Sequence, residues 1–198
     1  MKPTTPADMI TVSRIVMAPV VLIAAALSRG TIEPFWPMLA FVVFVIGALS
    51  DLVDGIVARF TGTSDWGARW DPIADKILVW AALFGIVIAG GLGGWHLIPV
   101  IVLIARDVLV DLARQKRSIP VNWMGKTKTF LAMLAIILLL ASPAITYTLI
   151  WNPGGYGLWM FPNAGLLWVG TGILWLAALL SVISALGYLS KPKQAVPA

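Results

Sequence analysis

Long apolar stretches, separated by short segments rich in glycine, proline or charge, dominate the pattern of this chain. A bilayer core of about 30 Å needs about 20 apolar residues in a helix, and the sequence supplies that length repeatedly. We therefore predict six transmembrane helices over approximately residues 10–28, 36–58, 73–92, 97–114, 129–150 and 164–189. Turns rich in glycine at 90–94 and 151–157 separate consecutive spans, and short connections favour antiparallel neighbours. The predicted fold class is an all-α integral membrane protein with a single domain over residues 1–198.

The composition agrees with lipid as the main solvent. Hydrophobic residues make up 60% of the chain and charged residues only 12%, whereas a soluble domain has about 25% charged residues. Cysteine is absent, which excludes a disulfide framework, a zinc–thiolate site and a cysteine nucleophile. The single histidine, His96, lies beside the predicted outer loop, where we interpret it as an interfacial residue.

Basic residues predict the orientation of the helices, because cytoplasmic loops concentrate Lys and Arg. With six spans, almost all of them fall on one side of the membrane, and only Arg29 falls on the other. The residues on the basic side are Lys2, Arg59, Arg69, Lys76, Arg114, Lys116, Arg117, Lys126, Lys128, Lys191 and Lys193. Both termini are therefore expected in the cytoplasm. The net charge of +5 then indicates an anionic lipid bilayer as partner rather than nucleic acid.

Two aspartates end the second predicted span, at a depth where ionisable groups are costly and usually mark a functional site. Asp51 and Asp54 are three residues apart and therefore share one helix face. Gly55 and Ala58 follow on the same face, at four and seven residues from Asp51. Their small side chains leave room for a bulky ligand beside the carboxylates.

A second pair, Asp71 and Asp75, begins the third predicted span at a spacing of four residues, with Pro72 expected in the first helical turn. Four carboxylates that converge from adjacent helices repel one another unless a cation neutralises them. Oxygen ligands without His or Cys suit hard ions, so we predict Mg²⁺ or Mn²⁺ before Zn²⁺. The alternative for any single aspartate is a carboxylate solvated at a helix end.

Two non-enzymatic functions are compatible with acidic residues in a membrane bundle. A small cation transporter would need ionisable groups along the whole path, but only Arg29 and Glu33 lie toward the outer side. A structural membrane protein with a bound ion would leave the spacing of Gly55, Ala58 and Arg59 unexplained.

The aspartates belong to a longer motif. Residues 51–59, DLVDGIVAR, and residues 67–75, GARWDPIAD, resemble the D-x-x-D-G-x-x-A-R…G-x-x-x-D-x-x-x-D signature of the CDP-alcohol phosphatidyltransferases. This resemblance implies a six-helix membrane enzyme that moves a phosphatidyl group from a CDP-linked lipid onto an alcohol and releases CMP. It also implies a multi-pass protein of a bacterial-type inner (cytoplasmic) membrane with its active site facing the cytoplasm, and a homodimer as the family expectation.

The resemblance also implies roles for individual residues. Asp51, Asp54 and Asp71 would hold two divalent ions, and Asp75 would deprotonate the acceptor hydroxyl and serve as a further metal ligand. The candidates for binding CDP-diacylglycerol are Gly55, Ala58, Arg59, Ser64, Gly67, Asp8 and Thr11. A guanidinium such as that of Arg59 can bind a phosphate group with two hydrogen bonds, although the same residue also fits a positive-inside helix end.

Segments outside the motif bear on the acceptor alcohol. Residues 6–19 resemble a segment of the phosphatidylglycerophosphate synthases and cardiolipin-synthase relatives, with Asp8 in place of Asn. Residues 104–107 and 122–129 resemble segments of the phosphatidylglycerophosphate synthases, with Asp107 in place of Glu, while Trp70 replaces Leu in the aspartate motif. We therefore predict sn-glycerol 3-phosphate as the acceptor and phosphatidylglycerophosphate as the product. Other acceptors for the same chemistry are phosphatidylglycerol, inositol phosphate and serine.

The phosphate group of a phosphorylated acceptor is negatively charged, so its binding site should contain basic residues. Arg106 lies inside the fourth predicted span, where an unpaired guanidinium is costly, so it should meet an anion or a carboxylate. The candidates for binding the acceptor phosphate are Arg106, Lys126, Lys128 and Arg14. The alternative pairs Arg106 with Asp107 or Asp111 and leaves the lysines to lipid headgroups.

Overall fold

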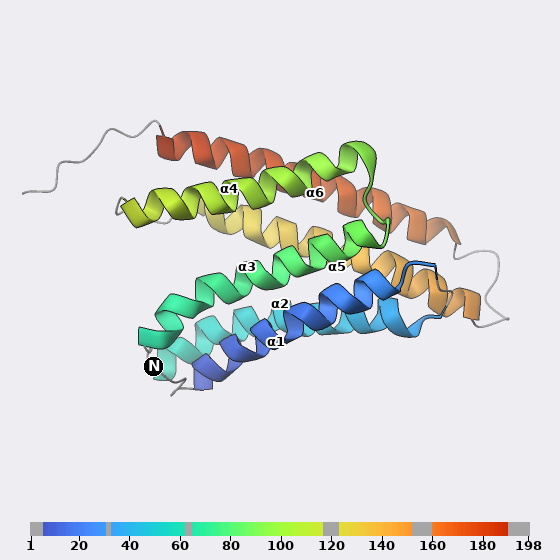
Figure 1. Cartoon of the computed structure of the whole chain (residues 1–198), viewed down its shortest axis with the longest axis horizontal. Coiled ribbons are helices and arrows are strands. Elements are labelled where there is room, and N and C mark those ends of the chain that lie inside the picture. Colours follow the sequence, from blue (N-terminus) through green and yellow to red (C-terminus); the bar gives the residue numbers. More distant parts are fainter. Residues whose placement is uncertain (1–5, 31–32, 62–64, 117–122, 152–159, 190–198) are drawn as a thin grey trace, which may run out of the picture.

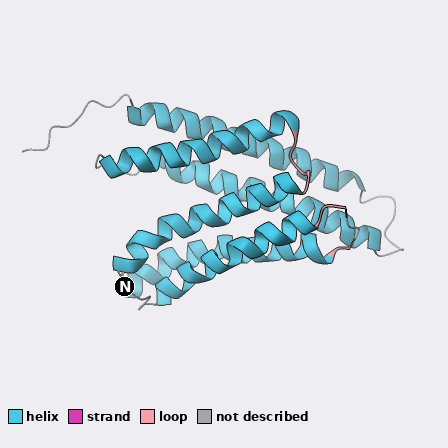
Figure 2. Cartoon of the chain, viewed as in Figure 1, coloured by secondary structure: helices cyan, strands magenta, loops and turns pink. Residues whose placement is uncertain are grey.

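Six long helices account for most of the chain in the computed structural model, which describes residues 6–30, 33–61, 65–116, 123–151 and 160–189 (Figures 1 and 2). They are α1 Pro6–Leu27, α2 Phe35–Thr61, α3 Asp65–Ile88, α4 Leu97–Lys116, α5 Trp123–Trp151 and α6 Met160–Leu189, with a short 3-10 turn, η1, at Gly94–His96. Each predicted span overlaps one of these helices, so the all-α fold class is confirmed.

The six helices form two groups around α2 and α5 (Figure 1). Helices α1, α2 and α3 pack together, α5 joins α2 to α6, and α4 packs mainly on α6. Helices α3 and α4 are consecutive in the sequence and run in opposite directions, as the short connection predicts, but they share few contacts. Each takes a parallel partner instead, α3 with α1 and α4 with α6.

The motif aspartates lie inside helices, which corrects the predicted boundaries. Helix α3 begins at Asp65, so Pro72 stands in its interior and not in its first turn. A proline lacks one backbone N–H, and this loss is local enough for the helix to continue on both sides. Helix α2 likewise extends beyond Asp54 to Thr61. Both aspartate pairs therefore have a regular helical spacing.

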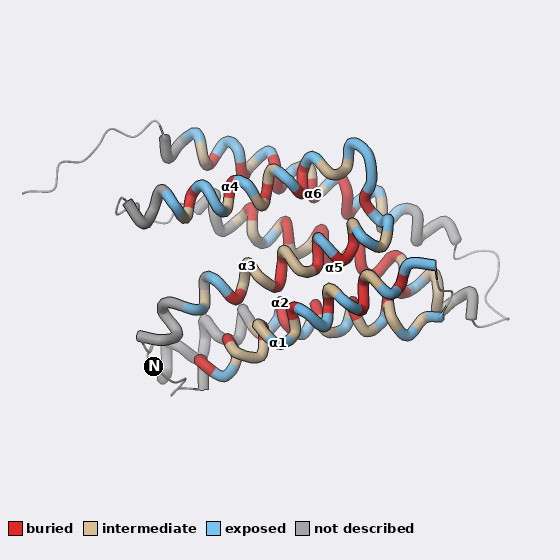
Figure 3. The backbone as a smooth tube through the Cα atoms, in the orientation of Figure 1, coloured by how far each residue is buried: buried red, intermediate tan, exposed pale blue. Residues whose placement is uncertain are grey.

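Buried residues line the contacts between helices, and exposed residues lie on the outside of the bundle (Figure 3). Many of the exposed residues are large and apolar. Phe44, Leu78, Ile136 and Leu174 are fully buried at helix contacts. Exposed apolar residues occur on all six helices and include Val16, Ile46, Phe84, Ile101, Phe130 and Leu176. Soluble monomers rarely expose so continuous an apolar surface, so this outer surface indicates a membrane protein.

Three helical segments are long and apolar enough to cross a bilayer among the residues whose side chains are described: Asp8–Leu27, Thr127–Thr148 and Gly165–Leu186. A shorter apolar segment covers Phe35–Ser50. Helix α4 carries Arg106, Asp107 and Asp111, which lower its hydropathy. Membrane crossing by all six helices remains a prediction.

The glycine-rich turn predicted at 90–94 is confirmed. Gly90 and Gly94 adopt positive φ angles of 82° and 56°, a conformation that favours glycine. At the same end of the bundle, Arg29 Nη1 donates a hydrogen bond of 3.3 Å to the carbonyl oxygen of Ile88 at the end of α3. Of the second predicted turn, 151–157, all but Trp151 lies outside the described residues.

A glycine permits the close approach of α1 and α3. A Cβ atom added at Gly85 would lie 2.7 Å from the Cβ of Ala25 and 3.1 Å from the carbonyl oxygen of Leu22. The glycine is therefore part of the packing that brings the polar ends of these helices together.

We expect Gly85→Ala to destabilise the protein by about 1–3 kcal/mol, because the added methyl group forces the two backbones apart. A lower apparent Tm in mild detergent would show this loss. Gly172→Ala is the matched control, since a Cβ atom at this exposed helical position meets nothing within 4 Å. Equal Tm values for the two variants would contradict the proposed packing constraint.

Candidate active site

Two aspartates of α3 face a buried polar stripe of α1. The Thr11 hydroxyl donates a hydrogen bond to Asp71 Oδ1, and Arg14 Nη1 lies 4.0 Å from Asp75 Oδ1. Asp8, Thr11 and Arg14 follow one another at intervals of three residues and are at most 1% exposed. Burial of such polar groups is costly without partners, so their position marks a site built between the two helices.

The register of the two parallel helices explains this juxtaposition. Thr11 meets Asp71 and Arg14 meets Asp75, and further along the same two helices Ala25 approaches Gly85. The same face of α1 is apolar toward its carboxyl end, where Val21 and Ala25 are buried in the core. The apolar half of this face therefore fixes the register that aligns the polar half.

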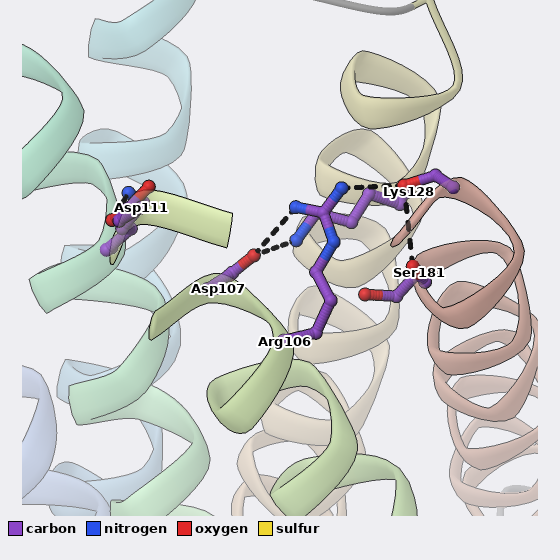
Figure 4. A network of polar contacts seen from close by, with 7 residues as sticks. Arg106, Asp107, Asp111, Lys128 and Ser181 are labelled. Carbon is purple, nitrogen blue, oxygen red and sulfur yellow. Dashed lines mark hydrogen bonds and ion pairs between the residues drawn. The ribbon is translucent and has the colours of Figure 1, made fainter. Parts of the chain in front are cut away.

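A second polar cluster connects α4, α5 and α6 (Figure 4). Arg106 Nη1 donates a hydrogen bond of 3.2 Å to Asp107 Oδ1, and the same oxygen accepts a hydrogen bond from Lys128 Nζ. Arg106 Nη2 donates a bond of 2.6 Å to the hydroxyl of Ser184 on α6. The pairing of Arg106 with Asp107, which the sequence offered as an alternative to phosphate binding, is thus present.

An ion pair joins the two groups of helices at the same end of the bundle. Lys76, the residue after Asp75, donates to Asp111 Oδ2 on α4, and both side chains are partly exposed. Since α3 and α4 pack little against each other, this ion pair is a direct contact between the aspartate site and α4.

The helix directions bring all these charged groups to one end of the molecule. They stand near the beginnings of α1, α3 and α5 and from the middle of α4 toward its end, with the Ser184 hydroxyl near the end of α6. Helices α4 and α6 run opposite to α1, α3 and α5 (Figure 1). Arg29 lies at the opposite end, beside the carboxyl end of α3, and Glu33 precedes α2 at that end.

A family model described as CDP-alcohol phosphatidyltransferase matches residues 4–183. The chain belongs to this family. It is therefore a transferase, which excludes the transporter and the purely structural membrane protein considered from sequence.

Curated relatives cover most of this phosphatidyltransferase. A "Probable phosphatidylglycerophosphate synthase" of Mycobacterium tuberculosis (strain H37Rv) is 31% identical over 93% of this chain and 80% of its own length. A "CDP-diacylglycerol--glycerol-3-phosphate 3-phosphatidyltransferase" of Rickettsia bellii is 31% identical over 93% of both chains. A protein of the same name from Salmonella typhimurium is 30% identical over 92% of this chain and 91% of its own length.

Members of this family use divalent metal ions, and the donor chemistry of the site fits such ions. Asp71 and Asp75 supply carboxylate oxygens from successive turns of α3, next to the hydroxyl of Thr11. Hard cations prefer oxygen ligands of this kind. Among the described side chains, no group of three or more His, Asp or Glu residues is placed to hold a metal.

The remaining motif residues of this phosphatidyltransferase are placed only by their backbone. Their positions in α2, α3 and α5 are helical, but their side chains lie outside the description; they are Asp51, Asp54, Gly55, Ala58, Arg59, Gly67 and Lys126. Ser64 lies outside the described residues. The convergence of four aspartates therefore stays a prediction.

Sequence reasoning missed two features of this site. Ser184 was not among the predicted site residues, but its hydroxyl accepts a hydrogen bond from Arg106. Arg14 was predicted to bind the acceptor phosphate, and the structure places it beside Asp75. Two signals in the sequence pointed to this position of Arg14: its helical spacing from Thr11, and the cost of burying a guanidinium without a partner.

Proposed function

We propose that this chain transfers the phosphatidyl group of CDP-diacylglycerol to the primary hydroxyl of sn-glycerol 3-phosphate, giving phosphatidylglycerophosphate and CMP. The observation that carries the proposal is the aspartate motif on α2 and α3, in a chain whose relatives are named for this reaction along most of their length. The choice of glycerol 3-phosphate as acceptor is supported by those relatives and by the basic residues Arg106 and Lys128, which lie near the same end of the bundle.

The acceptor hydroxyl would be activated by Asp75. Its carboxylate takes the proton of the primary hydroxyl while the oxygen attacks the phosphorus that bears the diacylglycerol group. The bond between this phosphorus and the bridging oxygen of CMP breaks, and the electron pair leaves with CMP. Arg14 Nη1, 4.0 Å from Asp75 Oδ1, would hold this carboxylate at the contact between α1 and α3.

The CDP group would lie against the aspartate motif. Asp51, Asp54 and Asp71, with Asp75 as a further ligand, would hold two Mg²⁺ or Mn²⁺ ions. The ions, when bound, neutralise the diphosphate oxygens and the charge that develops on the leaving group. Gly55, Ala58, Arg59, Ser64 and Gly67 would line the nucleotide pocket, with Asp8 and Thr11 at its α1 side.

We further propose a single membrane domain with six spans, both termini in the cytoplasm, and an active site that faces the cytoplasm of a bacterial-type inner membrane. The start of α1 and the end of α6 at one end of the bundle support this topology (Figure 1). CDP-diacylglycerol would enter from the inner leaflet with its acyl chains in lipid, and glycerol 3-phosphate from the cytoplasm. The homodimer remains a family expectation.

An acceptor panel tests the reaction. We expect the purified protein in detergent, with CDP-diacylglycerol and Mg²⁺ or Mn²⁺, to release CMP when glycerol 3-phosphate is added. The panel also contains phosphatidylglycerol, inositol phosphate and serine, and the products are identified by mass spectrometry. CMP release with a different acceptor alone would keep the chemistry and overturn the proposed acceptor.

A further inference from the structure

The guanidinium of Arg106 is held from two sides, by one residue of its own helix and one of α6. Asp107 Oδ1 lies 3.2 Å from Nη1, and Ser184 Oγ lies 2.6 Å from Nη2. Arg106 is 9% exposed and Ser184 only 1%. The Ser184 hydroxyl is 3.4 Å from the carbonyl oxygen of Ser181, so it can donate there while it accepts from Arg106.

The same cluster has more positive than negative charge. Among the side chains that the structure describes, Asp107 is the one carboxylate that pairs with both Arg106 and Lys128. Arg106 Nε is buried and has no hydrogen-bond partner there. A buried excess of one positive charge, with a hydrogen-bond donor to spare, suits an anionic ligand such as a phosphate group.

A guanidinium binds a phosphate best when its plane is already oriented, because an arginine side chain otherwise loses rotamer freedom on binding. Asp107 cannot fix this plane alone, since it adjoins Arg106 in the sequence and shares its oxygen with Lys128. Ser184 adds a second, independent point of attachment from another helix.

We propose that Ser184 is a positioning residue that orients Arg106 toward the phosphate group of the acceptor. The inference rests on the proposed function and deepens it. It assigns a role in acceptor affinity to α6, a helix that carries none of the site residues predicted from the sequence.

The test compares Ser184→Ala with Ser181→Ala. Ser181 is equally buried one helical turn earlier, and its hydroxyl has no hydrogen-bond partner among the described residues, so its removal controls for a lost buried hydroxyl. We expect Ser184→Ala to raise the KM for glycerol 3-phosphate about ten-fold, the usual scale for a hydrogen bond to a charged group. The KM for CDP-diacylglycerol and kcat should stay close to wild type. Ser181→Ala should match wild type in all three constants.

Rescue by the conservative variant completes the experiment. Ser184→Thr keeps the hydroxyl, so its KM for glycerol 3-phosphate should return toward the wild-type value. A KM for Ser184→Ala equal to that of Ser181→Ala would overturn the positioning role, as would an equal rise in the KM of both substrates or a fall in kcat alone. A wild-type protein that releases no CMP with glycerol 3-phosphate would instead overturn the proposed acceptor, and the inference with it.

Discussion

Asp75→Asn is expected to lower kcat for CMP release by about 10³-fold, at the scale that a positioned general base contributes. The amide of asparagine has nearly the same shape as the carboxylate but cannot take the proton of the acceptor hydroxyl. The substitution also removes the negative charge that faces Arg14 and that would contribute to metal binding. The initial rate of CMP release at saturating CDP-diacylglycerol and glycerol 3-phosphate measures this loss.

The control for Asp75→Asn is Glu33→Gln, which makes the same chemical change at the opposite end of the bundle. Glu33 is exposed, so this variant should retain wild-type activity and Tm. Both variants are first compared by size-exclusion chromatography and thermal unfolding, so that loss of fold is separated from loss of chemistry. An Asp75→Asn protein that keeps more than a tenth of wild-type kcat would remove Asp75 from the role of base.

Removal of divalent ions should abolish CMP release, and added Mg²⁺ or Mn²⁺ should restore it. The reason is electrostatic, because a diphosphate brought beside several aspartates repels them strongly unless cations lie between the charges. The measurement is CMP release by the wild-type protein after treatment with a chelator, followed by titration of each ion. Mn²⁺ binding without substrate, followed by electron paramagnetic resonance, gives a readout independent of turnover.

Asp71→Asn separates a specific metal site from a general effect of ionic strength. This variant should need a higher Mn²⁺ concentration for half-maximal binding, about ten-fold or more, while Glu33→Gln should bind Mn²⁺ as wild type does. Turnover that persists in excess chelator, or equal Mn²⁺ affinity in Asp71→Asn and wild type, would be incompatible with Asp71 as a ligand.

The helices were predictable because each contains an apolar run, although Arg106, Asp107 and Asp111 interrupt the run in α4. The boundaries of the helices were harder to predict where a helix contains polar residues. Asp65 begins α3 seven residues before Pro72, and α2 continues to Thr61 beyond the motif aspartates, because both segments keep helical hydrogen bonding through polar sequence. Hydropathy measures only the apolar part of such a helix, so it began α3 too late and ended α2 too early.

The amino-acid sequence by itself determined the helical content, the one-sided charge and the motif spacing of Asp71 and Asp75, because these depend on local periodicity. Only the tertiary structure decided which helices meet. Thr11 reaches Asp71 across 60 residues of sequence, and Arg106 reaches Ser184 across 78. Apolar helices resemble one another in hydropathy, so their pairing depends on close packing, as at Gly85, and on the need of buried polar groups for partners.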